Sequence, residues 1–303
     1  MSGRDWVRFG LLGLIWGTSF LWIKIAVSEA TPLVLVGFRT LSGAASLLVI
    51  LAWGKRLKLT WRELKPWIGI FFVVGLFNVT IPFILISWSE KTIDSGIASI
   101  LNSTTPLFTM LLAPIFLKDD GWTPAKLLGL ILGFGGVVVL MLPQISTGAN
   151  QNLVGYGTML LATLSYAIAG VYSRKKTPGL APEMQSFLQL GTATLMVWGI
   201  TFCVERPINV SFTPLAWTAM LWLGILGSAV AYILYFALIH SIGPTRTTTV
   251  TFVLPLVAVI LGVAFLGEQI YCQELLGGAM IVSGIMVVNL KWFQPQRIEE
   301  EPA

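Results

Sequence analysis

Residues 102–117 read NSTTPLFTMLLAPIFL, and 149 positions further along the chain residues 251–266 read TFVLPLVAVILGVAFL. The two segments share a Pro-Leu pair at the same place and the same Phe-Leu ending. The offset of 149 continues without a gap over positions 75–140, where fourteen residues are identical in the two copies. Because matched glycines and prolines are among them, a common apolar composition does not account for the agreement. We interpret the chain as two copies of one structural unit.

The composition around this repeat is that of a protein embedded in a membrane. Of the 303 residues, 55% are hydrophobic and 11% are charged, against about 25% charged residues in soluble domains. These values exclude a disordered chain and an ordinary soluble enzyme. The net charge of +5 does not indicate a nucleic-acid-binding protein, because the lysines and arginines lie in short clusters between apolar segments.

Ten apolar segments are each long enough to cross a hydrocarbon layer of about 30 Å. Short loops with turn residues such as Thr-Pro and Gly-Pro separate them. The first segment is too long for the apolar part of a cleaved signal peptide, so we expect it to be retained as a helix. The sequence therefore predicts an all-α integral membrane protein with ten transmembrane helices, at residues 9–27, 33–53, 67–88, 95–116, 125–143, 153–172, 184–204, 215–239, 247–266 and 274–292.

The distribution of positive charge predicts the orientation of these helices. With a cytoplasmic N-terminus, fifteen Lys and Arg residues lie on the cytoplasmic side, three on the outer side and one, Arg39, within a helix. Cytoplasmic loops carry such an excess, so we expect both termini in the cytoplasm. We divide the chain into a first five-helix repeat at 1–146, a second at 147–293 and a polar cytoplasmic tail at 294–303. Because five is odd, the second repeat must be inverted relative to the first, as in many secondary transporters.

Short motifs recur in a fixed order along the two repeats. They are Trp16-Gly17-Thr18-Ser19-Phe20, Phe38-Arg39, Thr105-Pro106-Leu107-Phe108, Gly129 with Gly135-Gly136, Gly243-Pro244-Thr245-Arg246, Pro255, Leu266-Gly267-Glu268 and Gly277-Gly278. In these motifs the chain resembles EamA-type members of the drug/metabolite transporter superfamily, over about residues 8–292. The resemblance implies an alternating-access transporter that exports amino acids or related metabolites across a bacterial inner membrane. The first repeat departs from the family pattern at Lys118-Asp119-Asp120, where Gly-Glu is common.

Polar side chains within the apolar segments are candidates for a binding site. A charge inside a membrane-spanning helix costs at least about 2.5 kcal/mol, and Arg39 is the clear case. It could contact an anionic group of a substrate, belong to an internal gate, or bond to carbonyl groups of neighbouring helices. Asn78 and Asn102 should face the interior of the bundle, because an unpaired amide in hydrocarbon costs several kcal/mol. Both could bind a substrate, and both could simply join helices.

Hydroxyl groups gather at matching places in the two repeats, each time in front of a proline. Thr248 and Thr251 precede Pro255, and a Ser/Thr run that begins beside Asn102 precedes Pro106. A proline leaves a carbonyl group one turn earlier without its partner. Paired interruptions of this kind indicate the substrate site of a secondary transporter, although the hydroxyls could instead bond back to their own helices. We expect both prolines to act as hinges.

Six aromatic side chains could complete a cavity around an apolar group, namely Trp16, Phe20, Trp88, Tyr166, Tyr232 and Tyr235. Trp16 lies in the first motif together with Ser19, and Tyr166 and Tyr232 lie near the middle of their segments. Packing against lipid or other helices is the alternative for each ring. Glu268, at the outer end of the ninth segment, could close an outer gate or carry a proton, or it could be an ordinary interfacial acid.

These residues together predict a cavity that is lined by uncharged hydroxyl, amide and aromatic groups and by one charged side chain, Arg39. Such a cavity suits an amino acid with an apolar or aromatic side chain, and the alternatives are another metabolite class (a sugar, a nucleoside or a cationic drug) or an integral-membrane enzyme. The predicted substrate-binding residues are Trp16, Ser19, Arg39, Asn78, Asn102, Tyr166, Tyr232, Thr248 and Thr251, and the predicted gating residues are Pro106, Pro255 and Glu268.

The chain shows no catalytic set of residues, so we expect a transporter rather than an enzyme. We expect no cofactor, no metal and no nucleic-acid partner. The expected partners are a small-molecule substrate and the lipid bilayer, and the chain would act as a monomer or homodimer in a bacterial inner membrane. Cys203 and Cys272 fall near the same outer face, where they could form a disulfide or remain small apolar side chains.

Overall fold

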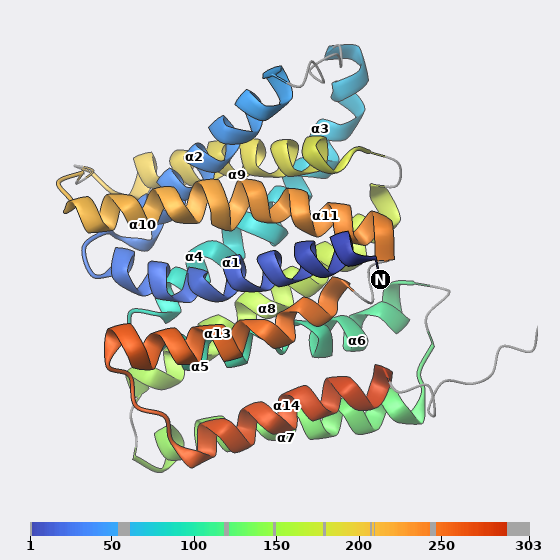
Figure 1. Ribbon diagram of the computed structural model, residues 1–303, viewed down its shortest axis with the longest axis vertical. Coiled ribbons are helices and arrows are strands. Elements are labelled where there is room, and N and C mark those ends of the chain that lie inside the picture. The colour runs from blue at the N-terminus through green and yellow to red at the C-terminus, as the bar shows by residue number, and fades with distance from the viewer. Residues whose placement is uncertain are drawn as a thin grey trace, which may run out of the picture.

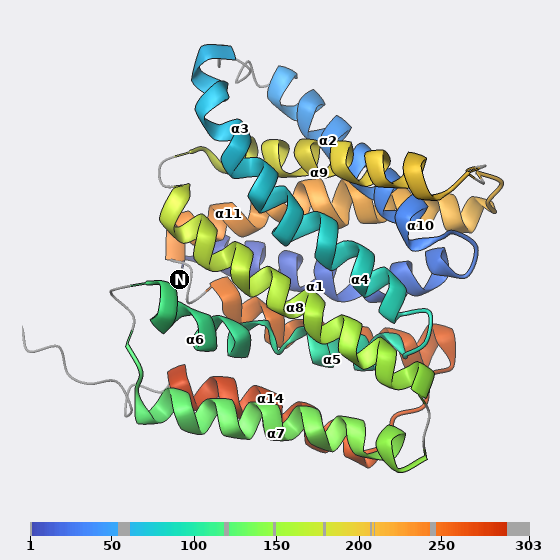
Figure 2. The ribbon, with the colours of Figure 1, turned by 180° about the vertical axis from the view of Figure 1, so that it is seen from behind.

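The computed structural model describes residues 2–53, 61–117, 121–147, 150–177, 180–206, 208, 210–242 and 247–289 (Figures 1 and 2). At 61–63, 146–147, 150–151, 240, 248 and 289 it describes the backbone alone. All regular structure in the described ranges is helical. Nine helical segments there are long and apolar enough to cross a membrane, and Cys272–Val288 is a shorter apolar helix. The ten predicted segments thus all correspond to helices.

The first repeat contains five membrane-spanning segments, two of which consist of more than one helix. Its elements are α1 (Gly3–Val27), α2 (Pro32–Trp53), α3 (Trp61–Gly75), the π-helical turn η1 (Leu76–Thr80), α4 (Ile81–Ser89), α5 (Ser95–Asn102), α6 (Thr105–Phe116) and α7 (Pro124–Thr147). Helix α1 begins earlier than the hydropathy pattern predicts, because Ser2 and Asp5 form a capping box at its start.

The second repeat has the same plan, again with two composite segments. Its elements are α8 (Asn150–Lys176), α9 (Pro182–Val204), α10 (Pro214–Gly224), the π-helical turn η2 (Ile225–Val230), α11 (Ala231–Ile242), the 3₁₀ helix η3 (Thr248–Phe252), α13 (Val253–Leu261), the π-helical turn η4 (Gly262–Leu266) and α14 (Cys272–Asn289).

Hydrogen bonds between loops identify one end of the bundle, which we call the Lys24 end. There Lys24, at the close of α1, bonds to the backbone after α4, and Ser89 donates to the carbonyl of Gly155 at the start of α8. Helix α1 therefore finishes at the Lys24 end, whereas α8 begins there. Since α1 and α8 are the first helices of the two repeats, the repeats are inverted relative to each other.

The two repeats interleave rather than forming separate lobes. Helix α2 packs on α9, α5 on α13 and α7 on α14, and each of these pairs joins the corresponding membrane-spanning segments of the two repeats. Likewise α1 packs on α11 and α13, as its counterpart α8 packs on α4 and α6. This pattern has the two-fold relationship that an inverted duplication requires. It also places the region between equivalent helices at the centre of the protein.

Glycines allow α7 and α14 to approach closely along one side of the bundle, where both views show them side by side (Figures 1 and 2). A β-carbon built on Gly129 would lie 2.5 Å from the carbonyl oxygen of Gly284, and one built on Gly284 would lie 2.5 Å from that of Gly129. The small residues of these segments thus serve a contact between repeats, as small residues do where membrane helices pack backbone to backbone.

Two π-helical turns lie at repeat-related positions, η1 in the third segment and η2 in the eighth. In the first, Pro82 has no N–H to donate to the carbonyl of Asn78, and the hydroxyl of Tyr232 donates to that carbonyl instead, over 3.3 Å. In the second, Ser228 Oγ donates to the carbonyl of Leu223, five residues earlier. π-Helical turns often mark functional sites.

Candidate functional site

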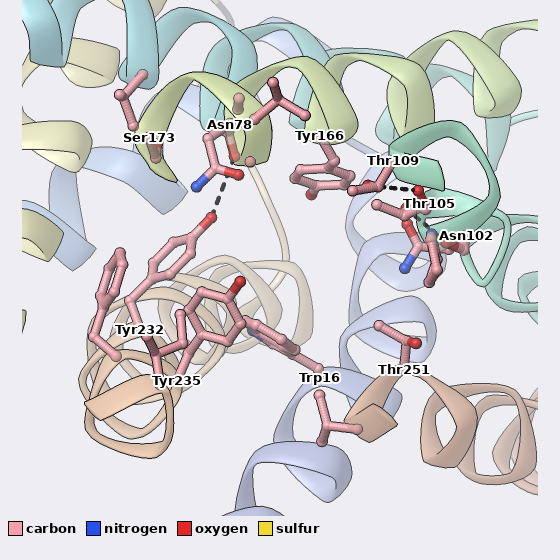
Figure 3. Close-up of a pocket in the computed structure, with 18 of the residues that line it drawn as sticks. Trp16, Asn78, Asn102, Thr105, Thr109, Tyr166, Ser173, Tyr232, Tyr235 and Thr251 are labelled. Carbon is pink, nitrogen blue, oxygen red and sulfur yellow. Dashed lines mark hydrogen bonds between the residues drawn. The ribbon is translucent and has the colours of Figure 1, made fainter. Parts of the chain in front are cut away.

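A cavity of about 650 Å³ lies between the two repeats. Its walls come from both repeats, chiefly from α1, η1, α6, α8, α9, α11 and η3 (Figure 3). The cavity extends to Arg174 and Thr177 at the end of α8 and to Leu117 at the end of α6. Because Arg174 is exposed, the cavity reaches the surface at this end, which is opposite to the Lys24 end. We call it the amino-terminal end, since α1 begins there.

Most residues predicted from the sequence line this cavity. Pro255 and Glu268 do not line it, and the side chain of Thr248 lies outside the described residues. The predicted residues in the cavity wall are Trp16, Ser19, Arg39, Asn78, Asn102, Pro106, Tyr166, Tyr232 and Thr251.

Arg39 is buried, with 4% of its surface exposed. Its Nε donates to Ser228 Oγ over 3.1 Å, and its Cζ lies 3.7 Å from the centre of the Phe83 ring. A guanidinium above an aromatic face gains cation–π stabilisation. Among the described residues, no carboxylate forms an ion pair with it. The arginine is thus held in place at the cavity wall while its charge stays without a counter-ion.

An amide pair joins the two repeats beside the arginine. Asn78 Nδ2 donates to Gln189 Oε1 over 3.0 Å, so the interhelical role considered for Asn78 is present. Gln189 is fully buried and lines the cavity, and its Nε2 has no hydrogen-bond partner among the described residues. A buried donor of this kind costs about 1–3 kcal/mol when it is left unsatisfied. It therefore marks a place where a ligand acceptor would be favoured.

The broken fourth segment supplies an acceptor. Helix α5 ends at Asn102 and α6 begins at Thr105, one residue before Pro106, so the interruption predicted there is confirmed. Asn102 Oδ1 is buried and has no hydrogen-bond partner in the described part of the chain. Ser103 Oγ, in the break itself, donates to the carbonyl of Thr251 over 3.2 Å. The two proline-interrupted segments therefore meet at the cavity.

Most hydroxyl groups of the Ser/Thr run bond within their own membrane-spanning segment. Thr105 donates to the carbonyl of Asn102 and Thr109 to that of Thr105. The exceptions are Ser103, which reaches Thr251, and Thr104, which donates to Thr163 Oγ1 over 3.1 Å. The alternative of back-bonding thus accounts for much of this run, and its cross-helix bonds hold α8 and η3 against the break.

Aromatic rings form the opposite part of the wall. Trp16 lies edge to face against Tyr232, with 6.2 Å between ring centres, and 5.4 Å from Tyr235. Figure 3 shows these rings and that of Tyr166 pointing into the same space. The result is an apolar surface with phenol hydroxyls at its edge, next to the arginine and the amides.

The bundle is closed at the Lys24 end by hydrogen bonds. Lys24 Nζ donates to the carbonyl oxygens of Glu90 and Ile93, at 2.8 and 2.7 Å. The carboxylate of Glu268, in the second repeat, accepts from Ser95 N, Ser95 Oγ and Gly96 N, at 2.7, 2.9 and 3.1 Å. It thereby caps the start of α5 in the first repeat, where a negative charge is favourable. Glu268 is thus part of the closure and lies away from the cavity.

Sequence reasoning missed several wall residues, among them Gln189 and Phe83. Gln189 had a usable signal: like Asn78 it is an amide in an apolar segment, and Gln185 stands one turn before it. Phe83 is one aromatic residue among many, and only the packing distinguishes it. Cys203 and Cys272 are both free and exposed, so the disulfide considered for them is not formed. In the described ranges, no three His, Cys, Asp or Glu residues gather as metal ligands.

An inverted repeat of five helices with a cavity at its centre is the architecture of multi-pass membrane transporters. The profile of the EamA-like transporter family matches the chain twice, at residues 7–142 and 153–290. The protein belongs to this family, and the two matches correspond to its two repeats.

Relatives along nearly the whole chain have names consistent with this family. "Uncharacterized transporter YvbV" of Bacillus subtilis (strain 168) is 29% identical, over 95% of this chain and 92% of its own. "Uncharacterized inner membrane transporter YedA" of Escherichia coli (strain K12) is 27% identical, over 92% of this chain and 88% of its own. A solved crystal structure shares the fold with a TM-score of 0.65 at 19% identity, over 95% of this chain and 96% of that one.

Proposed function

We propose that the protein is an alternating-access secondary transporter that exports amino acids with apolar or aromatic side chains across a bacterial inner membrane. The observation that carries this proposal is the set of unpaired groups in one cavity. These are the guanidinium of Arg39 without a counter-ion, the donor Gln189 Nε2 and the acceptor Asn102 Oδ1. In the described part of the chain the guanidinium has no ion-pair partner and the two amide atoms have no hydrogen-bond partner, and a zwitterion would supply complementary groups.

A zwitterionic head group suits these atoms. A carboxylate would accept from Arg39 and Gln189, since charge-assisted hydrogen bonds to guanidinium are among the strongest in proteins. An ammonium group would donate to Asn102. The apolar part of the substrate would then lie against Trp16 and Tyr235, which offer ring faces beside the polar groups. A volume of about 650 Å³ is within the range for small-molecule sites.

Other substrate classes suit the cavity less well. No acidic side chain lines it in the described residues, so a cationic drug would meet Arg39 without a compensating charge in the cavity wall. A sugar would leave the buried guanidinium without a counter-ion, which is costly in a desolvated site. A polyanion such as a nucleotide-sugar would need more cations than the wall supplies.

The inverted repeats support the transport cycle. In this structure the cavity reaches the amino-terminal end, and the excess of Lys and Arg predicts that this end is cytoplasmic. A substrate would therefore enter from the cytoplasm, and opening of the Lys24 end with closure of the other would release it outside. Two similar halves in opposite orientation can exchange conformations in this way.

Flux into proteoliposomes tests the proposal. We expect saturable transport of labelled leucine, phenylalanine or tryptophan, and competition by zwitterionic amino acids but not by decarboxylated amines. Without a pH gradient the substrate should equilibrate rather than accumulate. Transport of a sugar or a cationic drug with no amino-acid flux would contradict the substrate class. Absence of flux for every compound would contradict transport itself.

Three substitutions test the site. Arg39→Ala, Asn102→Ala and Thr251→Val should each lower the flux while leaving the amount of folded protein in the membrane unchanged. A matched control is Arg206→Ala, since Arg206 is exposed at the other end of the bundle, where its Nε donates to the carbonyl of Phe202. Unchanged flux in all three site variants would refute the assignment of this cavity as the substrate site.

A further inference from the structure

A buried acid without a partner lies in the closed end of the bundle. Glu90 directly follows α4 and is 0% exposed. Neither of its carboxylate oxygens has a hydrogen-bond partner among the described residues. An ionised carboxylate that is both desolvated and unbonded is among the costliest arrangements in a protein, and neutralisation by a proton removes that cost. A ligand that neutralises the carboxylate of Glu90 would therefore stabilise the protein. Because this side chain is fully buried, the ligand that fits is a proton.

The charged groups around Glu90 come from three neighbouring elements. Lys24 on α1 and Arg39 on α2 favour its ionised form, and Glu268 beyond η4 disfavours it. Burial has the largest influence and raises the pKa of Glu90 well above its ordinary value. Lys24 does not neutralise the carboxylate, because its Nζ donates to the backbone oxygens of Glu90 and Ile93. Asp94, the next acid along the chain, faces Lys24 and Glu268.

The position of Glu90 ties its burial to closure. The two bonds of Lys24 hold the backbone at Glu90 and Ile93, and the bonds of Glu268 hold it at Ser95 and Gly96. These bonds join α1 and Glu268 of the second repeat to the short stretch between α4 and α5. If they separate, water reaches the stretch that contains Glu90. A hydrated carboxyl returns toward its ordinary pKa and loses its proton at neutral pH.

We propose that Glu90 is a proton-binding site linked to the conformation of the Lys24 end: its carboxylate takes up one proton when this end closes and releases it when this end opens. The proposal rests on the alternating access proposed above, and it adds the proton as a second ligand of the protein. No bond other than the O–H bond of the carboxyl is made or broken.

The sign of the linkage follows from the two states. The closed state binds the proton more tightly than the open state, so acid favours closure and base favours opening. Between the pKa of the open state and that of the closed state, each pH unit changes the ratio of closed to open protein by up to about tenfold. Export should therefore slow as the compartment facing the Lys24 end is acidified.

Infrared spectroscopy of the purified full-length protein tests the site directly. At neutral pH we expect a band from a protonated carboxyl that shifts in D₂O and is absent in Glu90→Gln. Glu29→Gln is the matched control, because Glu29 is an exposed acid at the same end whose pKa is lowered by hydrogen bonds from Thr213. The band should persist in that control. Asp94→Asn identifies any contribution of the neighbouring acid. A band that survives in Glu90→Gln, or that is absent in the wild type, would refute the proposal.

A second measurement does not depend on the Glu90 variant. Glu268→Gln weakens the closure next to Glu90, so the band should decrease at the same pH. An undiminished band in a variant whose Lys24 end has been shown to open would refute the linkage.

In proteoliposomes, flux through the wild type should depend on the pH at the Lys24 end, and flux through Glu90→Gln should not. Loss of all amino-acid flux would refute the proposed function, whereas the infrared result would still decide the proton site.

Discussion

Arg39 Nε donates to Ser228 Oγ over 3.1 Å, and this bond joins the second helix of the first repeat to the π-helical turn η2 of the second. It fixes one edge of the guanidinium and leaves the other edge without a hydrogen-bond partner among the described residues, at the wall of the cavity. An arginine anchored in this way is oriented before a substrate arrives, which lowers the entropic cost of binding.

Replacement of this arginine should weaken binding of the substrate carboxylate. A hydrogen bond to a charged group contributes about 1.5–3 kcal/mol, so Arg39→Ala should raise the Kd for an amino acid roughly 10- to 100-fold. Arg39→Lys keeps the charge but lacks the planar fork of donors, so its Kd should lie between that of the wild type and that of Arg39→Ala. Calorimetry on the purified protein measures both. A Kd that is unchanged in Arg39→Ala would contradict a carboxylate site.

Asn102 allows function to be separated from stability. Its Oδ1 is buried without a partner in the described residues, so Asn102→Leu removes an unsatisfied acceptor. We expect the amino-acid flux to fall several-fold and the Tm in detergent to stay the same or rise. Thr163→Val is the control, because it breaks the bond between Thr163 and Thr104 and should lower the Tm. A fall in Tm for Asn102→Leu would indicate a structural role instead.

Glu268 should stabilise the closed Lys24 end. Glu268→Gln removes the charge that accepts three hydrogen bonds at the start of α5, at a cost of about 1.5–3 kcal/mol. The reporter is a single cysteine at the buried position Ala98, in a protein whose Cys203 and Cys272 are replaced by Ser. In the Glu268→Gln variant this cysteine should react with an impermeant maleimide roughly tenfold faster than in the protein that keeps Glu268.

The neighbouring acid Glu274 supplies the control for this experiment. It accepts only a long bond of 3.3 Å from Tyr271 N, so Glu274→Gln should leave the reactivity of the cysteine unchanged. Equal reaction rates in the two variants would show that the bonds of Glu268 do not hold this end closed.

The glycine contact between α7 and α14 should be intolerant of even one methyl group. A β-carbon on Gly136 would lie 2.5 Å from the carbonyl oxygen of Gly277, so Gly136→Ala forces the helices apart. Overpacking of this kind typically costs about 1–3 kcal/mol, and the Tm in detergent should fall by several degrees.

A glycine in open space should respond in the opposite direction. A β-carbon on Gly199 of α9 would meet nothing within 4 Å, and alanine is a better helix former by about 0.8–1.0 kcal/mol. Gly199→Ala should therefore keep or raise the Tm. If both glycine variants respond alike, close packing is not the reason for Gly136.

The segments and their duplication could be predicted because they follow from composition and spacing. Apolar length identifies a membrane helix, and the matched prolines Pro106 and Pro255 located the interruptions of two segments. Polar residues in apolar segments face the interior, which is why Arg39, Asn78 and Asn102 could be predicted to line a cavity.

Other features depend on packing that a sequence does not display. The π-helical turn η2 contains no proline, and its geometry follows from the contacts of Gly224 and Ser228 with α2. Glu90 stands next to Lys91 at a segment end, where an acid is normally solvated, and only the closure by Lys24 and Glu268 buries it. The hydropathy of a segment indicates how deep its residues lie in the membrane. It does not indicate which other parts of the chain pack over the end of that segment.

The pairing of α7 with α14 also has a consequence for the synthesis of the protein. Gly136 leaves the ribosome long before Gly277, about 140 residues later in the chain, so the close-packing face of α7 has no partner during most of translation. A chain that stops before Cys272 would present this face to lipid permanently. Helix α14 therefore completes the packing of α7, and a chain cut before Cys272 should be less stable in the membrane than the full one.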